Sequence, residues 1–245
     1  MAMDWGVELL RLSLISPGSL SIADSDWEAI TGEKEAETRQ LVQGGRRYVG
    51  KFAGGSLLLQ AVGNRLDVIL SPLPESNPQD FRVLVIGDWK VVREAFVQAT
   101  TRWLDASPIT ANRIAFGAVL LAEAKTVREG YELLKTLLSS VTVDPNSMRD
   151  LQFRVNWRAD SATLPGLPLN RITFWSVPQL TRMLLQVTGS DVTKTGSPAV
   201  QSVRLEMDHN TADEHTDVFD HKYLVPIYRE LVDMACENAA EGERP

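Results

Sequence analysis

Residues 47–70 contain the pattern that most constrains the fold. Three β-compatible runs follow one another here, RYVGKFA, SLLLQAV and RLDVIL, separated by Gly54-Gly55 and Gly63-Asn64. Such dipeptides tolerate the positive φ that two-residue hairpin turns require. The pattern therefore predicts an N-terminal three-stranded antiparallel meander. A glycine pair can also form a phosphate-binding loop, but no Gly-Lys-Ser/Thr sequence follows either pair.

The periodicity of the rest of the chain predicts further strands and helices. Strands are expected at 8–15, 113–121, 151–157, 169–177 and 200–207, and helices at 26–31, 88–104, 126–138 and 222–240. Residues 33–43 are expected to be a polar surface connection, 178–186 a strand continuation or a short helix, and 189–198 a mobile loop. This order lacks the regular strand–helix alternation of a parallel doubly wound sheet. It predicts an α+β fold, with an antiparallel sheet and about three main helices packed on one face.

We expect residues 1–245 to form a single domain, with two lobes, 1–108 and 109–245, as the alternative. A candidate internal repeat bears on this choice. A similar triplet opens each of three predicted strands, namely Asn64-Arg65-Leu66, Asn112-Arg113-Ile114 and Asn170-Arg171-Ile172. Asparagine is a common turn residue, and an arginine that follows it can alternate outward on a strand. We prefer this explanation because the residues that flank the three triplets do not repeat.

Composition limits the classes of partner. The net charge of −7 argues against a chain whose main function is to bind the phosphate backbone of nucleic acids. The cations comprise 18 arginines and 7 lysines, and arginine forms planar bidentate pairs, so many should be tied to carboxylates on the sheet. The single cysteine, Cys236, fits a reducing compartment. The N-terminus carries Asp4 and Glu8 and does not resemble a signal peptide. With no apolar run of about 18 residues, we expect a cytoplasmic protein without a membrane partner.

The stretch from Arg204 to Tyr223 holds the densest group of ligand-type side chains. It contains all three histidines of the chain, His209, His215 and His221. It also contains six acids, Glu206, Asp208, Asp213, Glu214, Asp217 and Asp220. The three histidines could bind a divalent metal, but their six-residue spacing matches neither the zincin nor the zinc-finger pattern. An acidic surface loop is the favoured interpretation, with Asp220 as the N-cap of the last helix.

Glu206 and Asp208 are the best catalytic candidates. They lie two apart on a predicted strand, so both carboxylates should point to one side, and His209 follows them. Metal-dependent nucleases use carboxylates in this way, and Lys222 could complete the group. Arg204, however, lies on the same face as a salt-bridge partner. The sequence contains no Walker, G-x-S-x-G, H-E-x-x-H or C-x-x-C motif in a supporting context.

The protonation of the histidines should separate the two interpretations. In a solvated acidic loop, neighbouring carboxylates would favour the charged imidazole and raise its pKa. In a metal site, the imidazoles would have to be neutral.

Three segments together suggest a family. NRIAFGAVLL before a helix, LQFRVNWRADS with LNRITFWSV, and VRLEMDHNTADE before the terminal helix resemble a sporadically distributed family of uncharacterised bacterial proteins. The resemblance covers about residues 112–237. It implies a bacterial cytoplasmic accessory protein and is compatible with mobile or defence-associated genes. No activity and no catalytic residue come with the resemblance.

These observations favour a non-enzymatic protein without a cofactor, which binds another protein through its acidic segment and hence prefers a basic partner. The alternative is a metal-dependent hydrolase or nuclease that uses Glu206, Asp208 and His209 with a divalent ion. A nucleic-acid module built on Arg154, Arg158 and Arg171 is less favoured at this net charge. A homodimer is compatible with the sequence.

Overall fold

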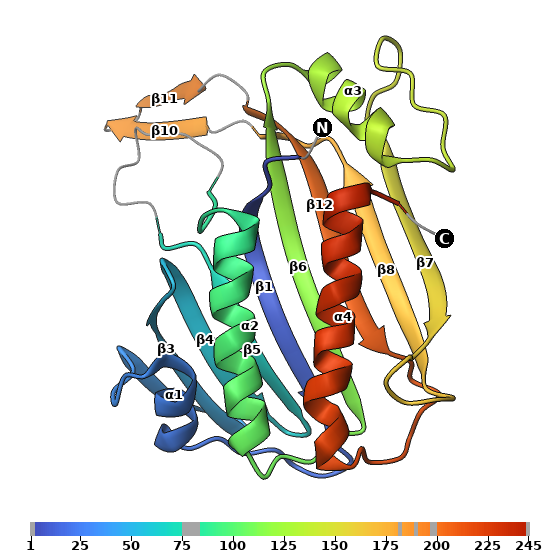
Figure 1. Ribbon diagram of the computed structural model, residues 1–245. Coiled ribbons are helices and arrows are strands. Elements are labelled where there is room, and N and C mark those ends of the chain that lie inside the picture. The colour runs from blue at the N-terminus through green and yellow to red at the C-terminus, as the bar shows by residue number, and fades with distance from the viewer. Residues whose placement is uncertain (1–2, 75–83, 181–182, 189–190, 197–199, 244–245) are drawn as a thin grey trace.

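An antiparallel sheet runs through the whole molecule (Figure 1). The structure is a computed structural model that describes residues 3–74, 84–180, 183–188, 191–196 and 200–243. Nine strands lie in the order β2-β3-β4-β5-β1-β6-β12-β8-β7, and β9 pairs with β12 beside this path. The strands of this sheet are β1 (Gly6–Ile15), β2 (Thr38–Val42), β3 (Gly45–Phe52), β4 (Gly55–Val62), β5 (Arg65–Ser71), β6 (Arg113–Ala124), β7 (Gln152–Asp160), β8 (Pro168–Ser176), β9 (Gln179–Leu180) and β12 (Val200–Thr211).

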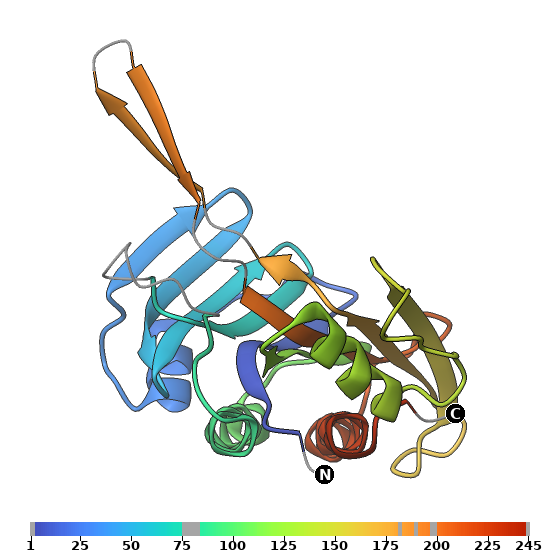
Figure 2. The same cartoon turned by 90° about the horizontal axis from the view of Figure 1, so that it is seen from above.

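The helices lie on one side of this sheet, as the view from above shows (Figure 2). They are α1 (Asp24–Thr31), α2 (Trp89–Ala106), α3 (Val127–Leu137) and α4 (His221–Glu241). Helix α2 packs on β1, and α4 packs on β6 and β12. A separate hairpin, β10 (Met183–Thr188) with β11 (Asp191–Gly196), projects from the opposite side of the sheet (Figure 2). We call the side away from α2 and α4 the helix-free face.

Strand alternation builds the core between sheet and helices. On β1, Leu10, Leu12 and Leu14 are fully buried, while Arg11 points to the helix-free face. The helices pack apolar stripes against this face of the sheet. Phe116 of β6, for example, contacts Tyr228 of α4 edge to face, with 6.0 Å between the ring centroids. Burial of one face only is the usual pattern for an antiparallel sheet with helices on one side.

Short polar signals fix the helix ends where the sequence suggested. The side chain of Asp88 accepts hydrogen bonds from Lys90 N and Val91 N, and Asp220 accepts one from Lys222 N. Thr126 caps α3 in the same way. Each cap satisfies a backbone donor that the first helical turn leaves free.

The α+β class and the antiparallel sheet are confirmed, but the meander has four strands rather than three. The additional strand, β2, lies in the range expected to be a surface connection. It is an edge strand exposed at nearly every position, so it lacks the alternation that marks a half-buried strand. The described chain has three longer helices and the short α1, which was expected at 26–31 and begins two residues earlier, at Asp24.

Two further boundaries differ from the prediction. Strand β12 continues to Thr211, four residues past its expected end. His209 and Thr211 take inward positions in this extension. Apolar residues usually fill such positions, so the sequence pattern did not reveal the continuation. The ranges 178–186 and 189–198 contribute β9, β10 and β11 where they are described. Residues 181–182, 189–190 and 197–198 of those two predictions lie outside the described residues.

Strands β1 and β6, which lie on either side of residue 108, pair from Gly6–Leu121 to Ile15–Arg113. The sheet is therefore continuous across the boundary between the two alternative lobes.

Substitution of Phe116 tests this core. Phe116→Ala should lower the free energy of unfolding by about 3–5 kcal/mol, because the side chain is fully buried and leaves a cavity beside Tyr228. Urea denaturation measures the change. Val91→Ala is the control, since Val91 is 67% exposed and should shift stability by at most about 0.5 kcal/mol. Equal effects of the two substitutions would contradict the core described above.

Candidate functional site

The register of β12 separates the candidate catalytic residues onto two faces of the sheet. Glu206 and Asp208 point to the helix-free face and are partly exposed, whereas His209 is fully buried toward α4. Neighbouring residues of a strand point to opposite sides, so the imidazole and the two carboxylates do not form one group. Lys222 lies apart from them, at the start of α4, where it pairs with Asp220 at 3.0 Å.

Arg204 binds Glu206 on the helix-free face. Its Nη1 lies 2.7 Å from Oε1 of Glu206, and its Nε and Nη2 each lie 3.2 Å from Oε2 of Glu8. One guanidinium therefore joins carboxylates from β12 and β1, across β6. The sequence suggested Arg204 as a partner of Glu206, and the structure confirms it.

Arg11 makes the corresponding contact with Asp208. The register aligns Arg11, Gly117 and Asp208 in one row across β1, β6 and β12. A Cβ atom on Gly117 would lie 3.3 Å from Nε and from Nη2 of Arg11, closer than most such contacts. The missing side chain therefore lets the guanidinium lie flat across β6 and bring its Nη2 within 3.5 Å of Asp208 Oδ1.

A third arginine–carboxylate group lies beside these on β5 and β1. Arg65 contacts both oxygens of Asp67 through Nε and Nη2, at 2.8–3.0 Å. Ser13 donates to Oδ1 of Asp67 at 2.5 Å. The carboxylate is 12% exposed, and both of its oxygens are occupied. This bidentate geometry is the strong form of an arginine–carboxylate pair.

A depression of 210 Å³ lies between these groups. Its floor contains Ser13 and Ala115, which are partners in the β1–β6 ladder. At one end Arg65 and Arg113 stand on either side of Ile15, because both pair with it in register. The other lining side chains come from β1 and β12, namely Arg11, Asp208 and Asn210. We call this the arginine depression. It brings together guanidinium groups from three strands of the sheet.

His209 lies on the other side of the sheet. Its Nδ1 is 3.2 Å from the carbonyl oxygen of Leu231, to which it donates, and its Nε2 is buried without a partner among the described atoms. Burial lowers the pKa of His209 to about 4, and the charge of Arg171 acts in the same direction, whereas the hydrogen bond to Leu231 opposes the shift. For His209, the expectation of a raised pKa in a solvated acidic loop is therefore wrong, because this residue belongs to a buried strand.

The other two histidines lie apart from His209. His221 is at the start of α4, with Nε2 2.7 Å from the carbonyl oxygen of Ser107. His215 stacks on Phe219, with 4.7 Å between the ring centroids. Across the described residues, no group of three or more His, Cys, Asp or Glu side chains is placed to hold a metal ion. The three metal-ligand candidates therefore do not converge.

The three arginines proposed to bind nucleic acid also lie on different faces of the sheet. Arg154 and Arg158 are exposed on β7, but Arg158 is already bound to Glu214 at 2.8 Å. Arg171 points to the helix side, where it contacts Asn238 at 2.9 Å and Glu237 at 3.1 Å. The three residues do not form one basic patch.

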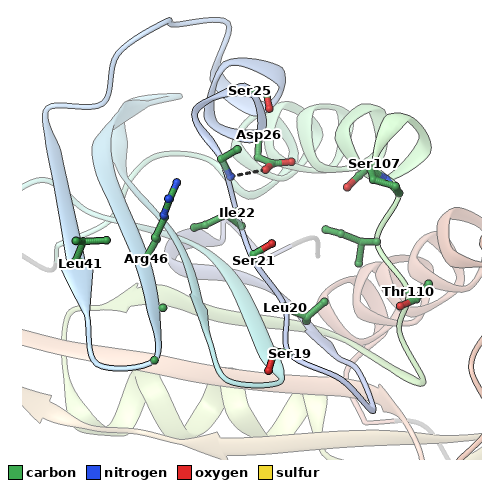
Figure 3. A pocket seen from close by; sticks show the side chains of 15 residues that line it. Ser19, Leu20, Ser21, Ile22, Ser25, Asp26, Leu41, Arg46, Ser107 and Thr110 are labelled. Atoms are coloured by element: carbon green, nitrogen blue, oxygen red, sulfur yellow. Dashed lines mark hydrogen bonds between the residues drawn. The ribbon is translucent and has the colours of Figure 1, made fainter.

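A larger hollow lies elsewhere, with a volume of 790 Å³ (Figure 3). Residues 19–23, the β2–β3 turn and residues 107–110 line it. Its serines could bind a polar ligand, and its size falls in the range of small-molecule sites. The carboxylate of Asp26 is already occupied, since Oδ1 accepts from Trp103 Nε1 and Oδ2 from Ala23 N. It is therefore poorly placed to take a proton from a serine.

The sequence identified the charged residues that β12 contributes to the helix-free face, but not those that β1 and β5 contribute. Arg11, Ser13 and Asp67 carry no motif, and more than 50 residues separate Ser13 from Asp67. One signal was present, because Arg65 and Arg113 belong to two of the Asn-Arg triplets that open strands. Their outward orientation agrees with the preferred explanation of those triplets. Their meeting on either side of Ile15 required the register.

Comparisons with protein-family models, with curated proteins and with solved structures found no match to the chain. None of the described helices combines the length and the apolar character needed to cross a membrane.

The low pKa of His209 predicts how stability depends on pH. The unfolded imidazole titrates near pH 6.5 and the folded one near 4, so at intermediate pH the unfolded state binds more protons. Stability should be complete above about pH 6.5 and fall by up to about 3 kcal/mol as the pH decreases toward 4. Urea denaturation at several pH values measures this loss. His209→Gln should flatten the profile over the same range, and an unchanged slope in this variant would contradict the assignment.

Proposed function

We propose that this chain is a non-enzymatic binding protein of the bacterial cytoplasm, and that the helix-free face is the surface that contacts its protein partner. The observation that carries the proposal is a broad sheet face without a covering helix in the described chain, on which charged groups are already arranged in pairs. The single cysteine agrees with a reducing compartment.

The size of the face supports a macromolecular partner. Nine strands at about 4.8 Å spacing span roughly 40 Å, and these strands of 5 to 12 residues, about nine on average, extend for about 30 Å at about 3.3 Å per residue. The resulting area of about 1,200 Å² exceeds the about 800 Å² that one protein contributes to a standard interface. A small substrate would use only a fraction of it.

The composition of the face also supports a protein partner. Half-buried apolar side chains alternate with the charged groups, and they are Leu58, Ile69, Val119, Ile172 and Phe174. Protein interfaces commonly combine apolar contacts with arginine and paired charges. The β10–β11 hairpin rises from the same side of the sheet (Figure 2) and would flank a partner bound there.

The pairing of charges changes the partner that the sequence suggested. Arg204 and Arg11 neutralise the charges of Glu206 and Asp208. These two acids therefore attract a basic partner less strongly than the sequence implied. The remaining acids of the segment lie beyond β12, where Glu214 is bound by Arg158.

The alternative of a metal-dependent hydrolase or nuclease has less support. A divalent ion would have to bind Glu206 and Asp208 without His209, and it would compete with the guanidinium groups of Arg204 and Arg11. No observation specifically favours this function.

The proposal predicts that a charge on the helix-free face removes the partner. Ile172→Glu places a carboxylate at a half-buried apolar position of β8, and Val91→Glu is the matched control on the exposed side of α2. Affinity purification from the encoding organism should recover a stoichiometric protein with the wild type and with Val91→Glu. Ile172→Glu should lose at least about nine-tenths of it, the equivalent of about 1.4 kcal/mol.

Two results would contradict this function. One is a set of bound proteins that Ile172→Glu leaves unchanged. The other is measurable turnover by a chain that retains no partner. If light scattering shows a dimer that Ile172→Glu dissociates, the partner is a second copy of the chain.

A further inference from the structure

We propose that the arginine depression binds one carboxylate group, and that this group anchors an acidic partner on the helix-free face. The inference deepens the proposed function and rests on it for the identity of the partner as a protein. The depression itself is lined by Arg11, Arg65, Arg113 and Asp208, and Asp67 is bound to Arg65 beside it.

The volume of the depression limits what it can hold. At 210 Å³ it is smaller than the about 300–1,000 Å³ of typical small-molecule sites. One side chain or one chain terminus fits such a space better than a whole metabolite. Because the depression lies near the middle of the sheet, on β1, β5, β6 and β12, a partner seated on the face would place a side chain over it.

Hydrogen-bond donors remain available in the depression. The side chain of Arg113 makes no hydrogen bond or ion pair with the described part of the chain. The Nε of Arg11 is buried, but the side chain as a whole is 29% exposed, so a ligand would reach this guanidinium through its terminal nitrogens. The one ion pair of Arg11, with Asp208, is long at 3.5 Å, which leaves its guanidinium able to bind another acceptor. A carboxylate that accepts from these charged donors forms charge-assisted hydrogen bonds, which are stronger than neutral ones.

The local charge selects a monoanion. Three guanidinium groups and the carboxylate of Asp208 line the depression, and Asp67 beside it is already fully bound by Arg65 and Ser13. The depression therefore has a surplus of one positive charge, which a single carboxylate neutralises. A phosphomonoester carries about −1.5 to −2 at neutral pH and would leave excess negative charge next to Asp208. A carboxylate also matches the planar fork of arginine.

Nuclear magnetic resonance of the arginine Nε–Hε groups tests the site directly. The probes are N-acetylglutamic acid α-amide, which has one side-chain carboxylate, N-acetylalanine, which has one terminal carboxylate, and inorganic phosphate. The first should cause saturable shifts of the Arg11 and Arg113 signals. The Arg128 signal should stay in place, because Arg128 is exposed on α3 and bound to Glu132. Equal binding of N-acetylalanine would identify a chain terminus as a second source of the same group.

Two variants and a matched control complete this test. Arg113→Ala should weaken binding of N-acetylglutamic acid α-amide about tenfold, because it removes a bidentate charged donor. Asp208→Asn should strengthen binding about fivefold, because it removes a negative charge from the lining of the depression, and two like charges about 4 Å apart in water repel by about 1 kcal/mol. Arg128→Ala should have no effect. The proposal is overturned if Arg11 and Arg113 show no saturable shift, if Arg113→Ala binds as the wild type does, or if phosphate binds most tightly.

A comparison with the partner experiment separates this inference from the proposed function. A partner that depends on Ile172 and is weakened about tenfold by Arg113→Ala supports both. If the partner depends on Ile172 but not on Arg113, the anchor is wrong and the binding face stands. Saturable carboxylate binding without any partner that depends on Ile172 would leave the anion site standing and overturn the proposed function.

Discussion

The pairing of β12 with β6, and of β6 with β1, is the interaction on which the rest of the structure depends. These three strands bring residues 6–15, 113–124 and 200–211 side by side at the centre of the sheet. Helices α2 and α4 cover one face of them, so alternate residues meet the core and the others meet the helix-free face. A one-residue shift would exchange the two sets, and the core leucines of β1 hold the register against it.

This alternation explains why the densest cluster of ligand-type residues does not act as one site. Asp208 and His209 are adjacent in sequence, yet one joins a row of charges and the other is buried with a low pKa. What assembles instead comes from separate parts of the chain. Gly117 contributes to this assembly, because a side chain there would crowd Arg11 and require its guanidinium to shift by a few tenths of an ångström.

Local signals predicted much of the fold and little of the site. The alternation of Leu10, Leu12 and Leu14, and the caps at Asp88 and Asp220, depend on neighbours in sequence, so they could be predicted. Strand β2 could not, because an edge strand with no buried side has no periodic pattern. The arginine depression could not either, since it depends on which strands are neighbours, and that order is not local information. The composition did indicate that arginines would bind carboxylates on the sheet, and in the described chain five such pairs lie on or beside the helix-free face.

The two faces of the sheet therefore carry different properties. The arginine–carboxylate pairs of the helix-free face are partly exposed, and such pairs contribute about 0–1 kcal/mol each to stability. Their number is hard to explain by stability alone. They do place planar donors in fixed positions before any ligand arrives, which reduces the entropy lost on binding. The opposite face holds the buried aromatic and aliphatic side chains on which folding depends. Since the stabilising contacts lie on one face and the available donors on the other, charge substitutions on the helix-free face should alter binding while leaving the fold intact.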